Sequence, residues 1–391
     1  MIKYLSAGIL IALFLFVLWG PIPVPPSMGR GDFRAYWSAA KLLAQSEDFA
    51  DANLLLQTEQ EHTQWQEEWA VITWNPPWLL ALLLPYTLVS FERATWLWLL
   101  TNITMVFTGS VLVWRTLANQ ADSRRRSHLA PIIGLLFLPT MIALLMGQVN
   151  TLVFMGLAGF LFFFNREQLF VAGLCLVLTL VKPHLVYLTL PVIFLHLLWM
   201  RRDYRALSGL IVGIVALTAA VFVLRPSFIA DYTQTVSEGS LLAWETPTLG
   251  GILGASFGWQ WAKLMGIVIL PLTIWFWWRN REQIDLNIWV QGTVLISVIT
   301  APFGWGYDVI VLLLPLLQIV IWIAEGRYSR LEAAGWAVSL IGINLAAVYQ
   351  RTFDISEVQT YWLPIALAVV YFLAYYRRRR VEAKGDKHFQ R

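Results

Sequence analysis

Long apolar runs separated by polar segments make up most of this chain from Leu5 to Tyr376. Many of these runs approach the length of about 20 residues that an α-helix needs to cross a bilayer. The pattern therefore predicts an all-α protein, a polytopic transmembrane helical bundle of about 12 spans. The expected spans are residues 4–25, 94–115, 129–146, 151–164, 169–182, 184–200, 206–224, 261–278, 286–301, 308–324, 331–349 and 360–376.

Some of these runs are short for a full crossing, since a helix rises about 1.5 Å per residue and the hydrocarbon core is about 30 Å thick. We therefore expect residues 129–164 and 169–200 to form tight hairpins or broken helices, with Gly147–Asn150 and Lys182–His184 at their tips. Residues 78–89 are expected to be re-entrant or interfacial.

Lys and Arg predict which side each loop faces, because cytoplasmic loops carry an excess of them. Most of the 28 Lys and Arg lie on the cytoplasmic side if the N-terminus is cytoplasmic and residues 78–89 do not span. Two long loops, residues 26–93 and 225–260, then face the outside. We expect a transmembrane domain over residues 1–376 with a retained first span, a basic tail over residues 377–391, cytoplasmic termini and a plasma membrane location.

The composition excludes several other classes of protein. Only 13% of the residues are charged and 58% are hydrophobic, whereas an ordinary soluble domain has about 25% charged residues. The net charge of +4 does not indicate nucleic acid as a partner, because the basic excess lies in loops between spans. The single cysteine, Cys175, permits no disulfide within the chain. The short cytoplasmic loops leave no room for a domain that binds nucleotide sugars.

The segment after the first expected span carries a carboxylate in a notable position. Helical patterning runs from Tyr36 to Ala44, and Asp32 precedes it. One interpretation makes Asp32 an ordinary N-cap of a helix that begins near Phe33. The other makes it a functional carboxylate at the level of the lipid headgroups, beside Tyr36 and Trp37.

Two polar tips interrupt apolar runs. Gly147–Asn150 is either a plain turn, since Gly and Asn tolerate left-handed backbone angles, or a site where Gln148 and Asn150 bind sugar hydroxyls or a phosphate. Lys182 is either a lysine whose ammonium reaches the outer surface or a functional cation at membrane depth. The phosphate of a lipid carrier is the natural partner for such a cation.

Other polar positions fit ordinary structural roles. Asp308 follows a Pro-rich and Trp-rich loop, and it is expected to cap the next span. A turn is expected at Glu245–Gly251, and the acidic residues between Glu47 and Asp51 are expected at a solvated helix end. The histidines show no zinc-type spacing, and no acidic triad is present, so no metal and no cofactor is expected.

In these positions the chain resembles the polytopic glycosyltransferases of the GT-C superfamily, and most closely family 87, the polyprenyl-phosphate-mannose-dependent alpha-1,2-mannosyltransferases. Each motif is common by itself, and their order along the chain carries the resemblance. The motifs are Asp-x-x-x-Tyr at Asp32 and Tyr36, an aromatic residue with Pro-Pro in Trp74–Pro77, Gly-Gln-x-Asn at Gly147–Asn150, Lys-Pro at Lys182-Pro183, and Pro-x-x-Trp at Pro302–Trp305.

The resemblance implies an inverting transfer of a hexose from a polyprenyl-phosphate sugar to a glycan or glycolipid acceptor outside the cytoplasm. Asp32 matches the acidic residue of the family's first loop and would be the general base. Lys182 would stabilise charge on the departing phosphate. We expect substrate or donor binding by a wider set of residues: Arg34, Tyr36, Gln148, Asn150, Lys182, His184, Trp305 and Asp308.

Two stretches depart from the family pattern. Gly306-Tyr307-Asp308 stands where the family often has Asp-His-His, and Glu245–Leu249 replaces a stretch like Asn-Gln-Ser-Leu. The sugar and the acceptor therefore stay open. A polytopic transporter or flippase is the alternative, but it would place ionisable groups near the bilayer midplane and often shows two related halves. The chain shows no internal repeat, and a purely structural scaffold would leave Lys182 and the long first loop unexplained.

Overall fold

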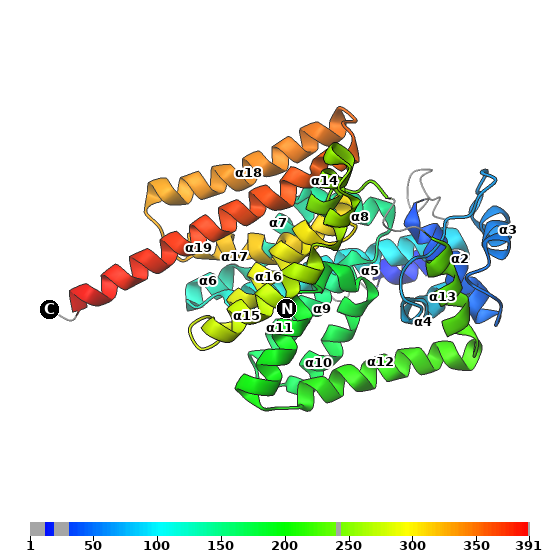
Figure 1. The fold of residues 1–391 in the computed structure, drawn as a ribbon, viewed down its shortest axis with the longest axis horizontal. Coiled ribbons are helices and arrows are strands. Elements are labelled where there is room, and N and C mark those ends of the chain that lie inside the picture. Colours follow the sequence, from blue (N-terminus) through cyan, green and yellow to red (C-terminus); the bar gives the residue numbers. More distant parts are fainter. Residues whose placement is uncertain (1–11, 19–30, 240–243, 390–391) are drawn as a thin grey trace. The chain divides into compact units, whose positions relative to one another are not determined.

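The computed structural model describes residues 12–18, 31–239 and 244–389. Every regular element in these ranges is a helix (Figure 1), which confirms the expected all-α fold. Most of the expected first span lies outside the described residues. The chain divides into two compact units, each considered by itself below. Unit 1 comprises Met1–Met105, Ile142–Val149 and Val212–Ser240, and unit 2 comprises Val106–Met141, Asn150–Ile211 and Leu241–Arg391.

Unit 1 contains the helices of the expected first long loop. Its core is aromatic: the ring of Phe33 stacks on Phe91 and on Trp98, with centroid distances of 6.0 and 5.7 Å. The Asp51 side chain caps α3 by accepting hydrogen bonds from two backbone amides, so the expected helix-end role of the acidic run is confirmed at this residue. The helices wholly in this unit are α2 (Asp32–Ala44), α3 (Ala52–Thr63), α4 (Trp78–Leu83), η1 (Leu84–Leu88) and α13 (Phe228–Glu238).

Unit 2 is made mostly of apolar helices. α5 (Phe91–Leu117), α8 (Leu138–Met146) and α12 (Arg205–Leu224) run through the division between the units. The others are α6 (Ala121–Arg125), η2 (Arg126–Leu129), α7 (Ala130–Leu136), α9 (Asn150–Phe164), α10 (Leu169–Val177), η3 (Leu178–Val181), η4 (Pro183–Val186), α11 (Thr189–Leu195), η5 (His196–Arg201), α14 (Leu249–Phe257), η7 (Gln260–Leu264), α15 (Gly266–Asn280), α16 (Leu286–Thr300), η8 (Gly306–Leu312), α17 (Leu313–Ala324), α18 (Arg330–Thr352), η9 (Glu357–Tyr361) and α19 (Trp362–Phe389).

The helices are consistent with a membrane protein, but the expected twelve spans are not confirmed. Among the described residues, six helices are long and apolar enough to cross a bilayer, or seven if one bent pair counts as a span. The helices over residues 150–164, 169–181, 189–201 and 286–300 are apolar but shorter. Residues 78–88 also form a short apolar helix. At about 1.5 Å per residue this helix is too short to cross alone.

The bent pair has a clear chemical cause. The helix over residues 123–136 and α8 meet at 65°: Phe137 between them has extended backbone angles, and Pro139, two residues on, lacks the amide hydrogen that a continuous helix would use. A break in an apolar helix leaves backbone groups that lipid cannot satisfy. The Asn344 amide satisfies both sides of this break, accepting from the Leu138 amide at 2.9 Å and donating to the Leu136 carbonyl at 3.1 Å.

Glycines allow α10 and the N-terminal part of α12 to pack with backbone contact. A Cβ atom on Gly173 would lie 1.8 Å from the Ala206 carbonyl oxygen, and one on Gly209 would lie 2.0 Å from the Phe170 carbonyl oxygen. Helices in membranes commonly associate through small residues in this way. The contact therefore requires glycine at both positions.

We expect Gly173→Ala to lower stability by about 2 kcal/mol or more, because overpacking against backbone cannot be relieved by a rotamer change. The melting midpoint of the purified protein in detergent measures this loss. Gly335→Ala is the matched control, since a Cβ atom there meets nothing within 4 Å. Equal midpoints for the two variants would contradict the packing argument.

Candidate functional site

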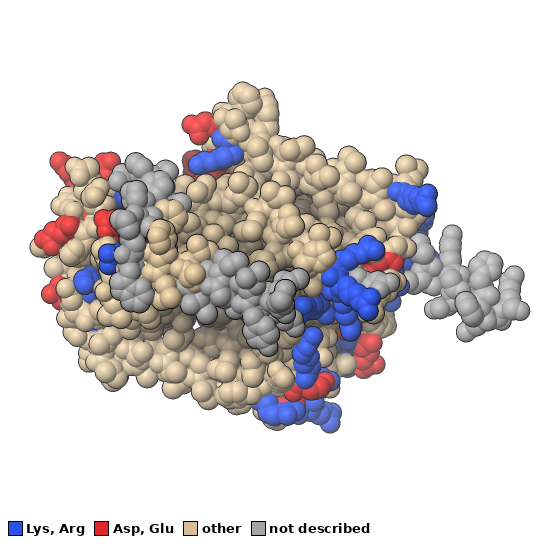
Figure 2. Space-filling model, turned by 180° about the vertical axis from the view of Figure 1, so that it is seen from behind, with Lys and Arg blue, Asp and Glu red and all other residues tan. Residues whose placement is uncertain are grey.

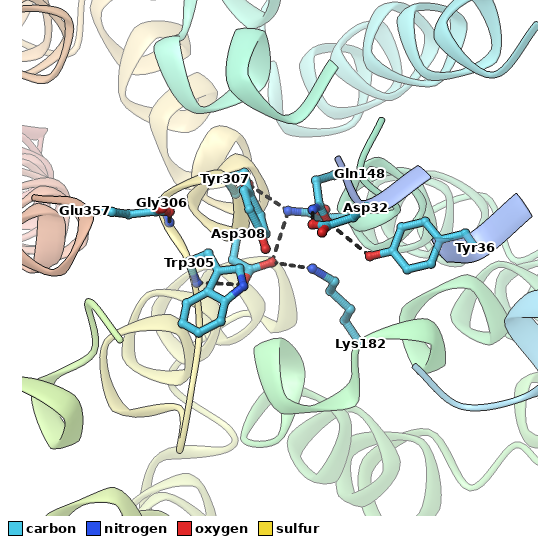
Figure 3. A network of polar contacts seen from close by, with 10 residues as sticks. Asp32, Tyr36, Gln148, Lys182, Trp305, Gly306, Tyr307, Asp308 and Glu357 are labelled. Carbon is cyan, nitrogen blue, oxygen red and sulfur yellow. Dashed lines mark hydrogen bonds and ion pairs between the residues drawn. The ribbon is translucent and has the colours of Figure 1, made fainter. Parts of the chain in front are cut away.

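One face of α2 in unit 1 brings together three of the residues that the sequence analysis selected (Figure 3). Asp32 and Tyr36 are four residues apart and share a helix face. The Gln148 side-chain amide donates a hydrogen bond to the Asp32 carboxylate, and its oxygen accepts one from the Tyr36 hydroxyl at 3.4 Å. Gln148 and Tyr36 are buried, whereas Asp32 is half-buried. The Asp32 carboxylate is thus held by Gln148, and its partial exposure leaves it accessible to a ligand.

A tight turn delivers Gln148 to this carboxylate. Gly147 has a φ of +67°, which favours glycine, and a Cβ there would lie 2.6 Å from the Cβ of Phe33. The Trp98 indole donates to the Gly147 carbonyl at 2.8 Å. The expected turn at Gly147 is confirmed, and the same turn orients a polar side chain toward Asp32.

The N-cap interpretation of Asp32 is wrong. α2 begins at Asp32 itself, Gly31 occupies the N-cap position, and no side chain caps the helix. The Gln148 amide contacts the carboxylate instead.

Arg34 points away from this group, because two residues turn a helix by about 200°. Its side chain is 1% exposed. It donates to the Thr63 hydroxyl at 2.7 Å, and its guanidinium lies 4.3 Å from the centre of the Trp65 ring. Arg34 therefore joins α2 to α3 and to the chain that follows α3.

Glu59 is a functional candidate that the sequence analysis missed. Its carboxylate is fully buried and accepts a hydrogen bond from the Val71 amide at 3.1 Å. Burial raises the pKa of Glu59 to about 7, although the Val71 amide and the charge of Arg34 act in the opposite direction. Nothing in the sequence separates Glu59 from the other carboxylates of the loop.

Unit 2 assembles a second polar group at the interruption between η3 and η4. Lys182 precedes Pro183, which disfavours helical angles there, and it has φ −140° and ψ 71°. Its side chain lies at the interruption and pairs with Asp308 at 2.9 Å, both groups being almost fully buried (Figure 3). The ammonium also lies 4.9 Å from the centre of the Tyr307 ring.

The Asp308 carboxylate accepts hydrogen bonds from three residues of unit 2 that are far apart or on different segments of the chain. One carboxylate oxygen accepts from Lys182 and from the Asn150 amide, at 2.9 and 3.0 Å. The other accepts from the backbone amide of Trp305 at 2.9 Å, and this contact caps η8. The expected capping role is confirmed, and the structure adds the ion pair with Lys182.

Asn150 offers an acceptor to a ligand. Its amide nitrogen donates to Asp308 and to the Tyr307 carbonyl, the latter at 2.7 Å. Its amide oxygen is buried and has no hydrogen-bond partner within the described part of the chain. Leaving a buried acceptor unsatisfied costs about 1–3 kcal/mol. A hydroxyl from a bound molecule would recover this energy.

Half-buried aromatic rings surround the loop before η8. The His184 ring lies 4.4 Å from Phe303, and the Trp244 ring lies 5.8 Å from Phe303 and 5.6 Å from Trp305, between ring centres. The Glu357 carboxylate, which the sequence analysis also missed, accepts from the Gly306 amide at 2.9 Å. The sequence shows Glu357 only as one carboxylate in a loop between apolar runs.

A family model described as glycosyltransferase family 87 matches residues 73–302. The match covers more than half of the 391 residues. It includes Gln148, Asn150 and Lys182, whereas Asp32 and Asp308 lie outside it. No curated protein and no solved structure matches the chain at a significant level.

We expect a pH dependence of stability that arises from Glu59. Its pKa of about 7 lies above the ordinary 4.5, so between these values the folded state keeps a proton that the unfolded chain releases. Below pH 4.5 Glu59 contributes roughly 3 kcal/mol to the free energy of unfolding, and this contribution is lost as the pH rises through 7. Melting midpoints across this range should fall less steeply in Glu59→Gln. An unchanged slope would contradict the assignment.

We expect Lys182→Met to destabilise the protein by about 3–5 kcal/mol, because it leaves a buried carboxylate without its counter-charge. Adding Asp308→Asn removes that charge, so the double variant should lose clearly less than the sum of the two single losses. Denaturation in detergent measures the three variants. Additive losses would show that the two groups do not interact.

Proposed function

Because the chain belongs to glycosyltransferase family 87 and is therefore a glycosyltransferase, we propose that it moves a hexose from a polyprenyl-phosphate sugar to an extracytoplasmic glycan or lipid acceptor, with inversion. Mannose is the hexose that the sequence resemblance suggests. The observation that carries the proposal is the half-buried Asp32 carboxylate, held by the Gln148 amide at the start of α2.

Asp32 is the proposed general base. A base must reach the proton that it removes, and this carboxylate is partly exposed, whereas Glu59 is fully buried. The Gln148 amide orients one oxygen of the Asp32 carboxylate. Tyr36 holds the Gln148 side chain from its other end.

Lys182 and Asn150 are the proposed contacts of the donor. The Lys182 ammonium, which pairs with Asp308, supplies the positive charge that we assign to a phosphate oxygen of the donor. The partnerless oxygen of Asn150 accepts a hydrogen bond from a sugar hydroxyl. His184 and Trp305 stay proposed contacts on the strength of their position near this group.

The reaction needs one bond formed, one broken and one proton moved. The acceptor oxygen attacks the anomeric carbon, the bond from that carbon to the phosphate oxygen breaks, and the acceptor proton passes to Asp32. The departing lipid phosphate gains negative charge, which Lys182 stabilises. We assign both groups of residues to one reaction because the resemblance to family 87 implies a base and a donor-binding cation in the same transfer.

The proposed location is the plasma membrane, with both termini in the cytoplasm and the site outside. Basic side chains gather on one part of the surface shown in Figure 2, whereas much of the rest of this view is uncharged. Such a basic region faces the cytoplasm under the positive-inside rule. Outside the cytoplasm a lipid-linked sugar can serve as the donor in place of a nucleotide sugar.

The family match gives no support to the alternative of a transporter or flippase. A transporter would move its substrate without making a glycosidic bond. Uptake by reconstituted vesicles without any sugar transfer would favour that alternative.

We expect Asp32→Asn to reduce sugar transfer at least a hundredfold, since a positioned base contributes about 10²–10⁴ in rate. The assay follows labelled sugar from a polyprenyl-phosphate donor into acceptor. Asp51→Asn is the matched control, because Asn caps a helix about as well as Asp. Full activity of Asp32→Asn, with normal expression, would remove Asp32 from the mechanism.

A further inference from the structure

The chain between α3 and α4 presents an exposed tryptophan from a fixed loop. Trp69 is 58% exposed, and its neighbours Gln66, Glu67 and Glu68 are also exposed. Its ring is thus presented among polar side chains, which makes this segment a candidate binding surface. We call residues 64–71 the tryptophan loop.

Both tryptophans of this loop are held in place. The Trp65 indole donates to the Trp69 carbonyl at 2.6 Å, and the two rings meet edge to face at 5.1 Å between centres. The Arg34 guanidinium lies over the Trp65 ring at 4.3 Å. The ring of Trp69 is therefore presented by a rigid support and loses little conformational entropy when it binds a ligand.

Polar contacts anchor both ends of the tryptophan loop to α3. The Glu59 carboxylate accepts from the Val71 amide, and the Glu59 carbonyl accepts from the Trp65 amide at 3.4 Å. The Gln60 side chain donates to the Glu67 carbonyl at 3.1 Å. These contacts hold the loop although it contains no helical turn.

The chemistry of the exposed side chains selects a carbohydrate as the ligand. The C–H face of a sugar ring packs on the electron-rich face of an aromatic ring, and amide and carboxylate groups bind sugar hydroxyls. Gln66, Glu67 and Glu68 supply these groups beside Trp69. Two adjacent carboxylates disfavour contact with an anionic lipid surface, which prefers basic residues.

We propose that the tryptophan loop binds a glycan acceptor at a sugar residue that does not itself react. This inference rests on the proposed function, because Asp32 lies on the same helix as Arg34, which supports Trp65. The two side chains leave α2 on nearly opposite sides, and Trp69 lies beyond Arg34 and Trp65, so the loop and the base are separated by more than the diameter of a helix, about 10 Å. The acceptor is therefore an extended oligosaccharide and not a single sugar.

The test measures binding of α-linked manno-oligosaccharides to the purified full chain in nanodiscs, without any donor. We expect Trp69→Ala to weaken binding of a pentasaccharide about five- to tenfold, as expected for the loss of one aromatic contact. Trp69→Phe keeps a ring and should retain most of the affinity. Trp199→Ala is the matched control, because Trp199 is 52% exposed and also meets a second tryptophan edge to face.

In the transfer assay, Trp69→Ala should raise the KM for the pentasaccharide by the same factor while kcat and the KM for a disaccharide stay unchanged. Unchanged pentasaccharide binding by a folded Trp69→Ala variant would overturn the inference. So would loss of quenching by brominated lipids in that variant, which would place Trp69 in the bilayer. Glycan binding that depends on Trp69, without any transfer by the wild type, would refute only the proposed function.

Discussion

Where an apolar helix is interrupted, the freed backbone groups and buried charges need partners in the protein, because lipid offers none. This constraint explains two side-chain contacts at breaks in the apolar helices. Asn344 satisfies the backbone at the break before Pro139, and Asp308 neutralises the lysine at the interruption before Pro183. The interruption before Pro183 also brings Lys182 and Asp308 together. A break that costs stability therefore supplies polar groups that can bind a ligand.

The sequence predicts the family from the order of its motifs. It also predicts several residues of the candidate site, because these lie at helix breaks that depend on nearby proline and glycine. Proline and glycine mark the breaks, and Gly147 and Lys182 lie at helix interruptions as expected. The expected N-cap role of Asp32 is wrong because the choice between a cap and a contact with Gln148 depends on a residue 116 positions away. Glu59 and Glu357 were missed for the same reason, since only the fold reveals which amides they meet. The number of spans is not confirmed, because several apolar helices are shorter than a crossing.

α2 shows how one short helix serves two purposes in unit 1. One side carries Asp32 and Tyr36, which meet Gln148, and the opposite side carries Arg34, which meets α3 and Trp65. The charge of Arg34 also lowers the cost of burying Glu59. A substitution at Arg34 therefore loosens α3 and the following loop before it affects the proposed base.

The ion pair of Lys182 with Asp308 joins residues that are 126 positions apart in the chain. Ribosomes add about 5–20 residues per second, so Lys182 is synthesised on the order of 10 s before its partner exists. During that interval the lysine has to stay hydrated or be shielded by the insertion machinery, since a charge alone in lipid is expensive. Biogenesis of this protein thus passes through a stage in which the helices around Lys182 cannot yet settle, and the last third of the chain completes them.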